Sequence, residues 1–121
     1  MGSGPEAYQE GEVGLVNLNE YQDRARKTAL GPAIDPDTAL VYTALGLNGE
    51  AGEYAEKVKK HIRDGTRMAG DAALELGDVL WYLAMSAFAI GYTLEEVAQL
   101  NVDKLRRRAV RDTLMGSGDD R

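Results

Sequence analysis

Cysteine is absent from this sequence of 121 residues, and histidine occurs only once. The absence of cysteine excludes disulfides and thiolate metal sites, and a single histidine excludes the usual histidine-rich zinc sites. A metal ion in this protein must therefore be bound by oxygen atoms. Carboxylates and water are the ligands that Mg²⁺ and Mn²⁺ prefer, and the sequence contains 20 acidic residues.

Positive charge is also scarce, with 14 Lys and Arg residues and a formal net charge of -6. Nucleic-acid binding requires a basic surface, so we expect no nucleic-acid partner. The first residues, MGSGPEAYQEGEVG, lack the basic and then apolar pattern of a secretory signal. The longest uncharged run, Val79 to Leu94, has 16 residues, fewer than the ~20 that cross a bilayer. We therefore expect a cytoplasmic protein without a membrane partner.

Strand patterns are missing as well, because β-branched residues are sparse and do not alternate with polar ones. The sequence predicts an all-α, four-helix bundle-like domain over residues 17–114, with tails at 1–16 and 115–121. Helices are expected over 19–30, from 37 or 38 to 64, from 71 to the C-cap glycine at 91, and from the capping box of Thr93 and Glu96 onward. The third helix is apolar nearly all round, so it should be central in the bundle. A chain this short can hardly bury that helix alone, and a homodimer or homotetramer would supply the missing cover.

Two pairs of acids interrupt apolar segments. Between Ala72 and Leu94 the charged residues are Glu75 and Asp78, three positions apart and so on one helix face. Glu50 and Glu53 have the same spacing, with no charge from residue 38 to 49. If these two helices pack antiparallel, the four carboxylates converge and can bind one or two Mg²⁺ ions. The alternative is that both pairs are ordinary acids on solvated helix faces.

Other polar and aromatic side chains are candidates for binding a ligand beside the metal. Lysines and an arginine could hold phosphates, but they could also form salt bridges at i, i+4 spacing (Glu53 to Lys57, Glu56 to Lys60) or neutralise a helix C-terminus. The aromatic pair after Asp78 could stack on a base or pack in the core. The candidates are Lys57, Lys60, Trp81, Tyr82, Asn101, Lys104 and Arg108. The last helix should turn inward the face that carries Leu94, Ala98, Asn101, Leu105 and Arg108.

The segments GLNGEAGEYAEKVKKHIRDG and ELGDVLWYLA resemble the ExxE and ExxD signature of the MazG-like, all-α nucleotide pyrophosphohydrolases. The opening LNEYQDRARKTA is similar to the first helix of that family, and TLEEVAQLNVDKLRRR is similar to its last. Many relatives carry a further glutamate directly before ExxE, where this chain has Gly49. A catalytic base that relatives have at that position therefore cannot be assigned to this chain.

This resemblance implies Mg²⁺-dependent hydrolysis of a nucleoside triphosphate to the monophosphate and pyrophosphate, in a dimer or tetramer that removes unwanted nucleotides. It implies metal ligands at Glu50, Glu53, Glu75 and Asp78, with Glu50 or Glu53 acting on the attacking water. The basic candidates would hold the phosphates. The substrate could instead be dUTP, dCTP or phosphoribosyl-ATP. A different class of function also stays open, namely a non-catalytic helical module that oligomerises through its apolar helix.

Overall fold

The computed structural model describes residues 14–65 and 69–115, and all their regular elements are helical. These elements are α1 (Leu18–Arg26), the 3-10 helix η1 (Gly31–Ala33), α2 (Ala39–Asp64), α3 (Ala69–Ala89) and α4 (Leu94–Met115). The all-α class is thus confirmed. The expected tails fall mainly on residues 1–13 and 116–121, outside the described residues, so the domain limits stay a prediction.

Two helix boundaries differ from the expectation. The first helix ends at Arg26, because the Thr28 hydroxyl donates to the carbonyl of Ala25 and the chain then enters turns. The third helix begins at Ala69, which places Asp71 in the first turn and not at the cap. Its predicted C-terminus is confirmed: Gly91 has φ +87°, and the amide of Tyr92 donates to the carbonyl of Ala87, as in a Schellman motif.

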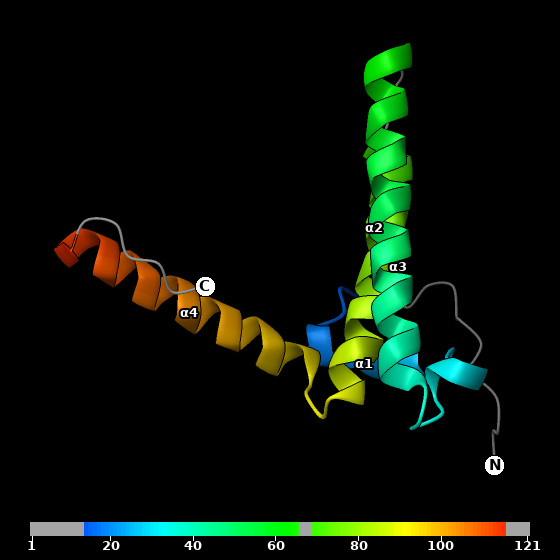
Figure 1. The fold of residues 1–121 in the computed structure, drawn as a ribbon, viewed down its shortest axis with the longest axis horizontal. Helices are drawn as coiled ribbons and strands as arrows, with labels where there is room; N and C mark the ends of the chain where they lie inside the picture. Colours follow the sequence, from blue (N-terminus) through cyan, green and yellow to red (C-terminus); the bar gives the residue numbers. More distant parts are fainter. Residues whose placement is uncertain (1–13, 66–68, 116–121) are drawn as a thin grey trace.

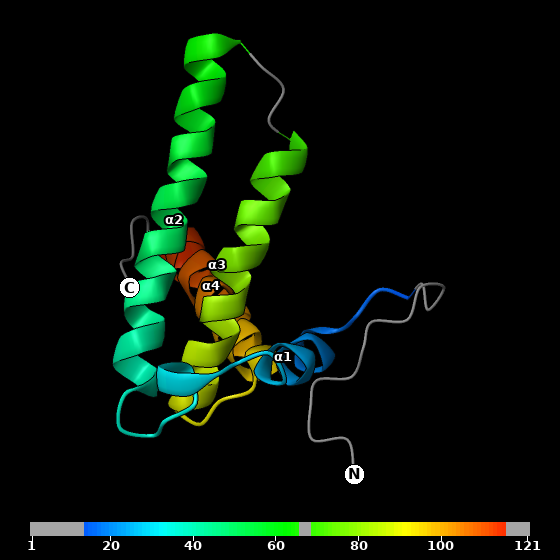
Figure 2. The ribbon, with the colours of Figure 1, turned by 90° about the vertical axis from the view of Figure 1, so that its right-hand side faces the viewer.

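α2 and α3 form a long antiparallel hairpin, and α1 crosses its end where α2 begins and α3 finishes (Figures 1 and 2). α3 also contacts α1 and α4, so the central position of the third helix is confirmed. Small side chains let the helices approach closely in the core, where Tyr21, Leu80 and Trp81 pack at the edge. The core residues are Ala25, Ala29, Ala33, Ala84, Met85 and Leu94.

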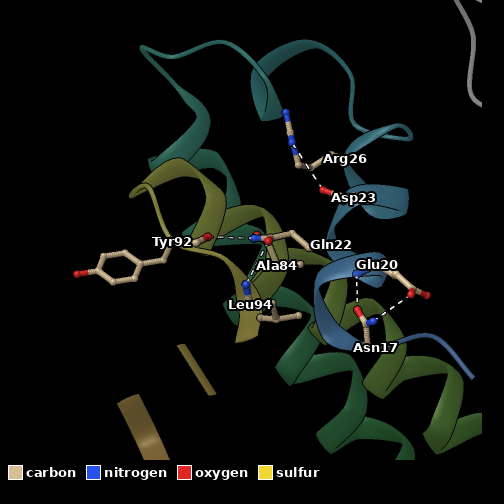
Figure 3. Close-up of polar contacts among 8 residues, drawn as sticks. All are labelled: Asn17, Glu20, Gln22, Asp23, Arg26, Ala84, Tyr92 and Leu94. Carbon is tan, nitrogen blue, oxygen red and sulfur yellow. Dashed lines mark hydrogen bonds and ion pairs between the residues drawn. The ribbon is translucent and has the colours of Figure 1, made fainter. Parts of the chain in front are cut away.

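α4 is attached to the rest of the protein at its N-terminus by α1. The buried side chain of Gln22 donates to the carbonyls of Ala84 and Tyr92 and accepts a hydrogen bond from the amide of Leu94 (Figure 3). Asn19 accepts a hydrogen bond from the amide of Glu95. The capping box is confirmed, since Thr93 and Glu96 exchange side chain to backbone hydrogen bonds.

Beyond this attachment α4 projects away from the hairpin (Figure 1). The expected inward face is therefore wrong within a single chain: Leu94 is buried, but Leu105 is 49% exposed and Asn101 is exposed. Large apolar side chains are exposed on α3 as well, with Leu74 at 73%. Residues Gly70–Ala89 are long and apolar enough to cross a membrane by length and composition only, a test that the core helix of a soluble protein also passes.

Candidate metal centre

Three of the four predicted acids meet across the hairpin. Glu50 on α2 and Glu75 and Asp78 on α3 each place a carboxylate oxygen within 4.8 Å of the others. Glu50 and Glu75 are half-buried, whereas Asp78 is exposed. The antiparallel packing produces this meeting, because Glu75 and Asp78 lie one turn apart on the face of α3 directed at α2.

The cluster is electrostatically unfavourable without a cation. Burial raises the pKa of Glu50 above its ordinary value of 4.5, and the charges of Asp78, Glu75 and Glu53 raise it further. A divalent cation among these oxygens would reverse that balance, since it favours the ionised carboxylates. The all-oxygen donor set also suits Mg²⁺ or Mn²⁺. The residues therefore fit a hard divalent cation.

Glu53 lies one turn further along α2 and is exposed. It does not belong to the group of three acids within 4.8 Å, although its charge contributes to the raised pKa of Glu50. Its assignment as a metal ligand stays a prediction.

We expect Glu50→Gln to raise the free energy of unfolding of the metal-free protein near pH 7. Removing one charge relieves like-charge repulsion, and solvent screening limits the gain to a few tenths of a kcal/mol. A raised pKa means that ionisation of Glu50 costs stability in the folded state. The gain should therefore develop as the pH rises above 4.5 and vanish below it, where Glu50 is protonated in both states. Urea denaturation in EDTA at several pH values measures this difference.

Glu56→Gln on the same helix is the matched control for this experiment. Glu56 pairs with Lys59 at 3.1 Å, and this partner lowers the pKa of Glu56 through a hydrogen bond and charge. Its substitution should not stabilise the protein. Equal stabilisation by both substitutions would contradict a repulsive cluster around Glu50.

Two tyrosines lie next to the acids, of which Tyr82 is a candidate from the sequence and Tyr21 is not. Burial raises the pKa of Tyr21, on α1, and the charge of Asp78 raises it further. Burial also raises the pKa of Tyr82, with contributions from Tyr42, Glu50 and Asp78. The position of Tyr82 one turn after Asp78 identifies it as a neighbour of the site from the sequence, whereas Tyr21 lies on a distant helix and has no such local signal.

The aromatic pair on α3 makes contacts within the chain. The indole N–H of Trp81 donates to the hydroxyl of Thr28 at 2.8 Å, which ties α3 to the chain after α1. The rings of Trp81 and Tyr82 meet edge to face, with centroids 4.9 Å apart. Both residues are half-buried. Stacking on a base stays a prediction for each.

The lysines on α2 lie beyond the acids along the same helix. Lys57 is seven residues after Glu50, on the same face, and is half-buried, whereas Lys60 is exposed. The ion pairs expected at i, i+4 spacing do not form among the described residues. Glu56 pairs with Lys59 and not with Lys60, and Glu53 has no ion pair with another described residue. Phosphate binding by these lysines stays a prediction.

The candidates on α4 are not brought to the acids within one chain. Asn101, Lys104 and Arg108 lie on the part of α4 that projects away from the hairpin (Figure 1). Their predicted contacts with phosphate therefore need another arrangement of α4 or a second copy.

A cavity of about 360 Å³ lies at the end of the hairpin where α2 begins and α3 finishes. Its lining is mostly apolar, contains no carboxylate, and includes Arg26, whose guanidinium lies 3.6 Å from the ring centre of Phe88. This cavity is separate from the acid cluster.

Comparison with known proteins agrees with the geometry. Residues 40–111 match the family described as the MazG nucleotide pyrophosphohydrolase domain. The "Gene 37 protein" of Mycobacterium phage L5 is 40% identical over 114 residues, which cover 88% of this chain and 100% of that protein. No solved structure matches. The family match confirms the resemblance seen in the sequence, and the chain belongs to the MazG nucleotide pyrophosphohydrolase family.

Proposed function

We propose that this protein hydrolyses nucleoside triphosphates to the monophosphate and pyrophosphate with the help of Mg²⁺, or Mn²⁺ in its place. The observation that carries the proposal is the meeting of Glu50, Glu75 and Asp78 within 4.8 Å across two antiparallel helices. Membership of a pyrophosphohydrolase family supports this reaction. We further propose a cytoplasmic role in removing unwanted nucleotides.

Glu50, Glu75 and Asp78 would hold the cation, which when bound neutralises phosphate charge and acidifies water. Glu53 lies next to this group without belonging to it. It is therefore our choice for the carboxylate that orients the attacking water and accepts its proton. Lys57 lies on the same helix face as Glu50, about 10 Å further along the axis, where its ammonium group could reach the terminal phosphates of the substrate.

We also propose that a second copy of the chain covers α4 and the outer face of α3. The exposed Leu100, Leu105 and Val110 on α4 support this, with exposed fractions of 56%, 49% and 53%. In such a homo-oligomer, Asn101, Lys104 and Arg108 of one copy could approach the phosphates bound by the other. This arrangement would give α4 the substrate-binding part that it does not have within one chain.

The test is incubation of the purified protein with ribonucleoside and deoxyribonucleoside triphosphates, dUTP and phosphoribosyl-ATP, each with Mg²⁺, Mn²⁺ or EDTA. We expect pyrophosphate and the monophosphate in equal amounts with a divalent cation, and neither in EDTA. The relative kcat/KM values then identify the preferred substrate.

Two results would overturn the proposal. Release of inorganic phosphate in place of pyrophosphate would put the cleavage at a different bond. Absence of hydrolysis for every nucleotide, with no stabilisation by Mg²⁺, would favour a non-catalytic helical module.

A further inference from the structure

One close contact joins α2 and α3 directly beside the acid cluster. Gly46 precedes Glu50 by four residues on α2, and Tyr82 follows Asp78 by four residues on α3, so each pair shares one helix face. Because the helices are antiparallel, the contact of Gly46 with Tyr82 lies one turn from the meeting of Glu50 with Asp78. The acids and this contact therefore form consecutive layers of the same hairpin.

The tyrosine ring rests against the bare backbone of Gly46. A Cβ atom added at Gly46 would lie 2.5 Å from Cδ1 and Cζ of Tyr82 and closer still to Cε1. At every other described glycine, including Gly49 and Gly52 on either side of Glu50, an added Cβ meets nothing within 4 Å. The absence of a side chain thus matters for packing at Gly46 in particular.

Neighbouring aromatic rings restrict the position of Tyr82. Trp81 meets it edge to face, and Trp81 is itself tied to Thr28 by a hydrogen bond of 2.8 Å. The ring of Tyr42, one turn before Gly46 on α2, lies 6.5 Å from that of Tyr82 between centroids. With Gly46 in front and Trp81 beside it, the ring of Tyr82 forms a close packing contact that fixes the separation of the two helices at this layer.

A packing contact at this position is important if the cluster binds metal, because it keeps α2 and α3 together. Three carboxylates repel one another when no cation is bound, and this repulsion pushes α2 and α3 apart. Mg²⁺ requires ligands in near-ideal octahedral geometry at about 2.0–2.1 Å, so a displacement of about 1 Å is costly. If α2 and α3 already have the correct spacing before the metal binds, no free energy of binding is lost in bringing the two helices together.

We propose that Gly46 and Tyr82 are positioning residues, whose contact holds α2 and α3 at the spacing that brings Glu50 to Glu75 and Asp78. The inference rests on the proposed use of these acids as metal ligands. It gives Tyr82 a role that differs from stacking on a nucleobase. It also implies that the lack of a side chain is required at Gly46 and not at Gly49 or Gly52.

The test is the metal affinity of nucleotide-free protein, measured by calorimetry with Mg²⁺ and by electron paramagnetic resonance with Mn²⁺. We expect Gly46→Ala to weaken binding by about 10-fold to 100-fold, the range typical of residues that support metal ligands. Gly49→Ala adds the same methyl group to the same helix in open space and should keep the affinity. The double variant Gly46→Ala, Tyr82→Leu should recover much of the loss, because the smaller side chain makes room for the methyl group.

A second pair of variants keeps the test decisive if Gly46→Ala does not fold. Tyr82→Phe retains the ring and should retain the metal affinity, whereas Tyr82→Leu alone should weaken it. A merely structural role would change the urea midpoint in EDTA without this pattern in affinity, and a base-stacking role would change the ranking of KM among nucleotides. Wild-type affinity in folded Gly46→Ala would overturn the inference, whereas a wild-type protein that binds no metal would overturn the proposed function itself.

Discussion

Asp78→Asn is expected to lower the kcat/KM for pyrophosphate release by at least about 100-fold. The substitution removes one of the three clustered carboxylates and, with the proposed metal site, much of the stabilisation that a bound cation gives to the transition state, which is worth several kcal/mol. It should also remove the increase in melting temperature that we expect Mg²⁺ to cause in the wild-type protein, since that increase depends on binding to the folded state. Steady-state kinetics and thermal denaturation with and without Mg²⁺ measure the two effects.

Asp37→Asn supplies the matched control for this prediction. Asp37 is exposed before α2 and lies outside the acid cluster, so the same chemical change should leave both the kinetics and the Mg²⁺ response near the wild-type values. If Asp78→Asn kept full activity while Glu50, Glu75 and the fold were intact, the cluster would not be the metal centre.

Gln22→Leu is expected to lower the free energy of unfolding by about 2–4 kcal/mol. The backbone amide of Leu94 lies at the N-terminus of α4, where no carbonyl of the helix can accept its hydrogen bond. The side-chain oxygen Oε1 of Gln22 accepts this bond, at 3.1 Å from the amide nitrogen. The side-chain amide also links the carbonyls of Ala84 and Tyr92. Leucine fills a similar volume but leaves these buried groups without their partner.

Urea denaturation at a fixed protein concentration measures the loss, with Gln99→Leu as the control. Gln99 is exposed and bonds to Asp103 on the same helix, so its substitution should change stability by less than about 0.5 kcal/mol. Equal effects of the two substitutions would mean that Gln22 does not anchor α4. Hydrogen exchange at the first turn of α4 should rise only in the Gln22 variant.

Features set by neighbours along the chain were predictable from the sequence. The capping box at Thr93 and the left-handed Gly91 depend on local backbone chemistry, and both occur as expected. The meeting of Glu50 with Glu75 and Asp78 was also predictable, because three-residue spacing fixes a helix face and a short connection favours antiparallel packing.

Features set by distant contacts were not predictable in this way. The N-terminus of α4 is hydrogen-bonded to Gln22, a polar residue of α1 whose burial has no local sign in the sequence. Among the described residues, the helix face that the periodicity marks as inward is exposed at Asn101 and Leu105, because periodicity records which face is apolar and not what covers it. Likewise, sequence alone does not distinguish the three glycines of α2, and only the packing separates Gly46 from Gly49 and Gly52.

The acid cluster draws its residues from two helices that are consecutive in the chain. Packing of α2 on α3 closes only the short loop between them. The loss of chain entropy is therefore small, and this hairpin can form early and quickly during folding. Neither α1 nor α4 has to dock before these side chains come into range of one another. The proposed metal site is therefore encoded within one helical hairpin, and the flanking helices support this hairpin and complete its surroundings.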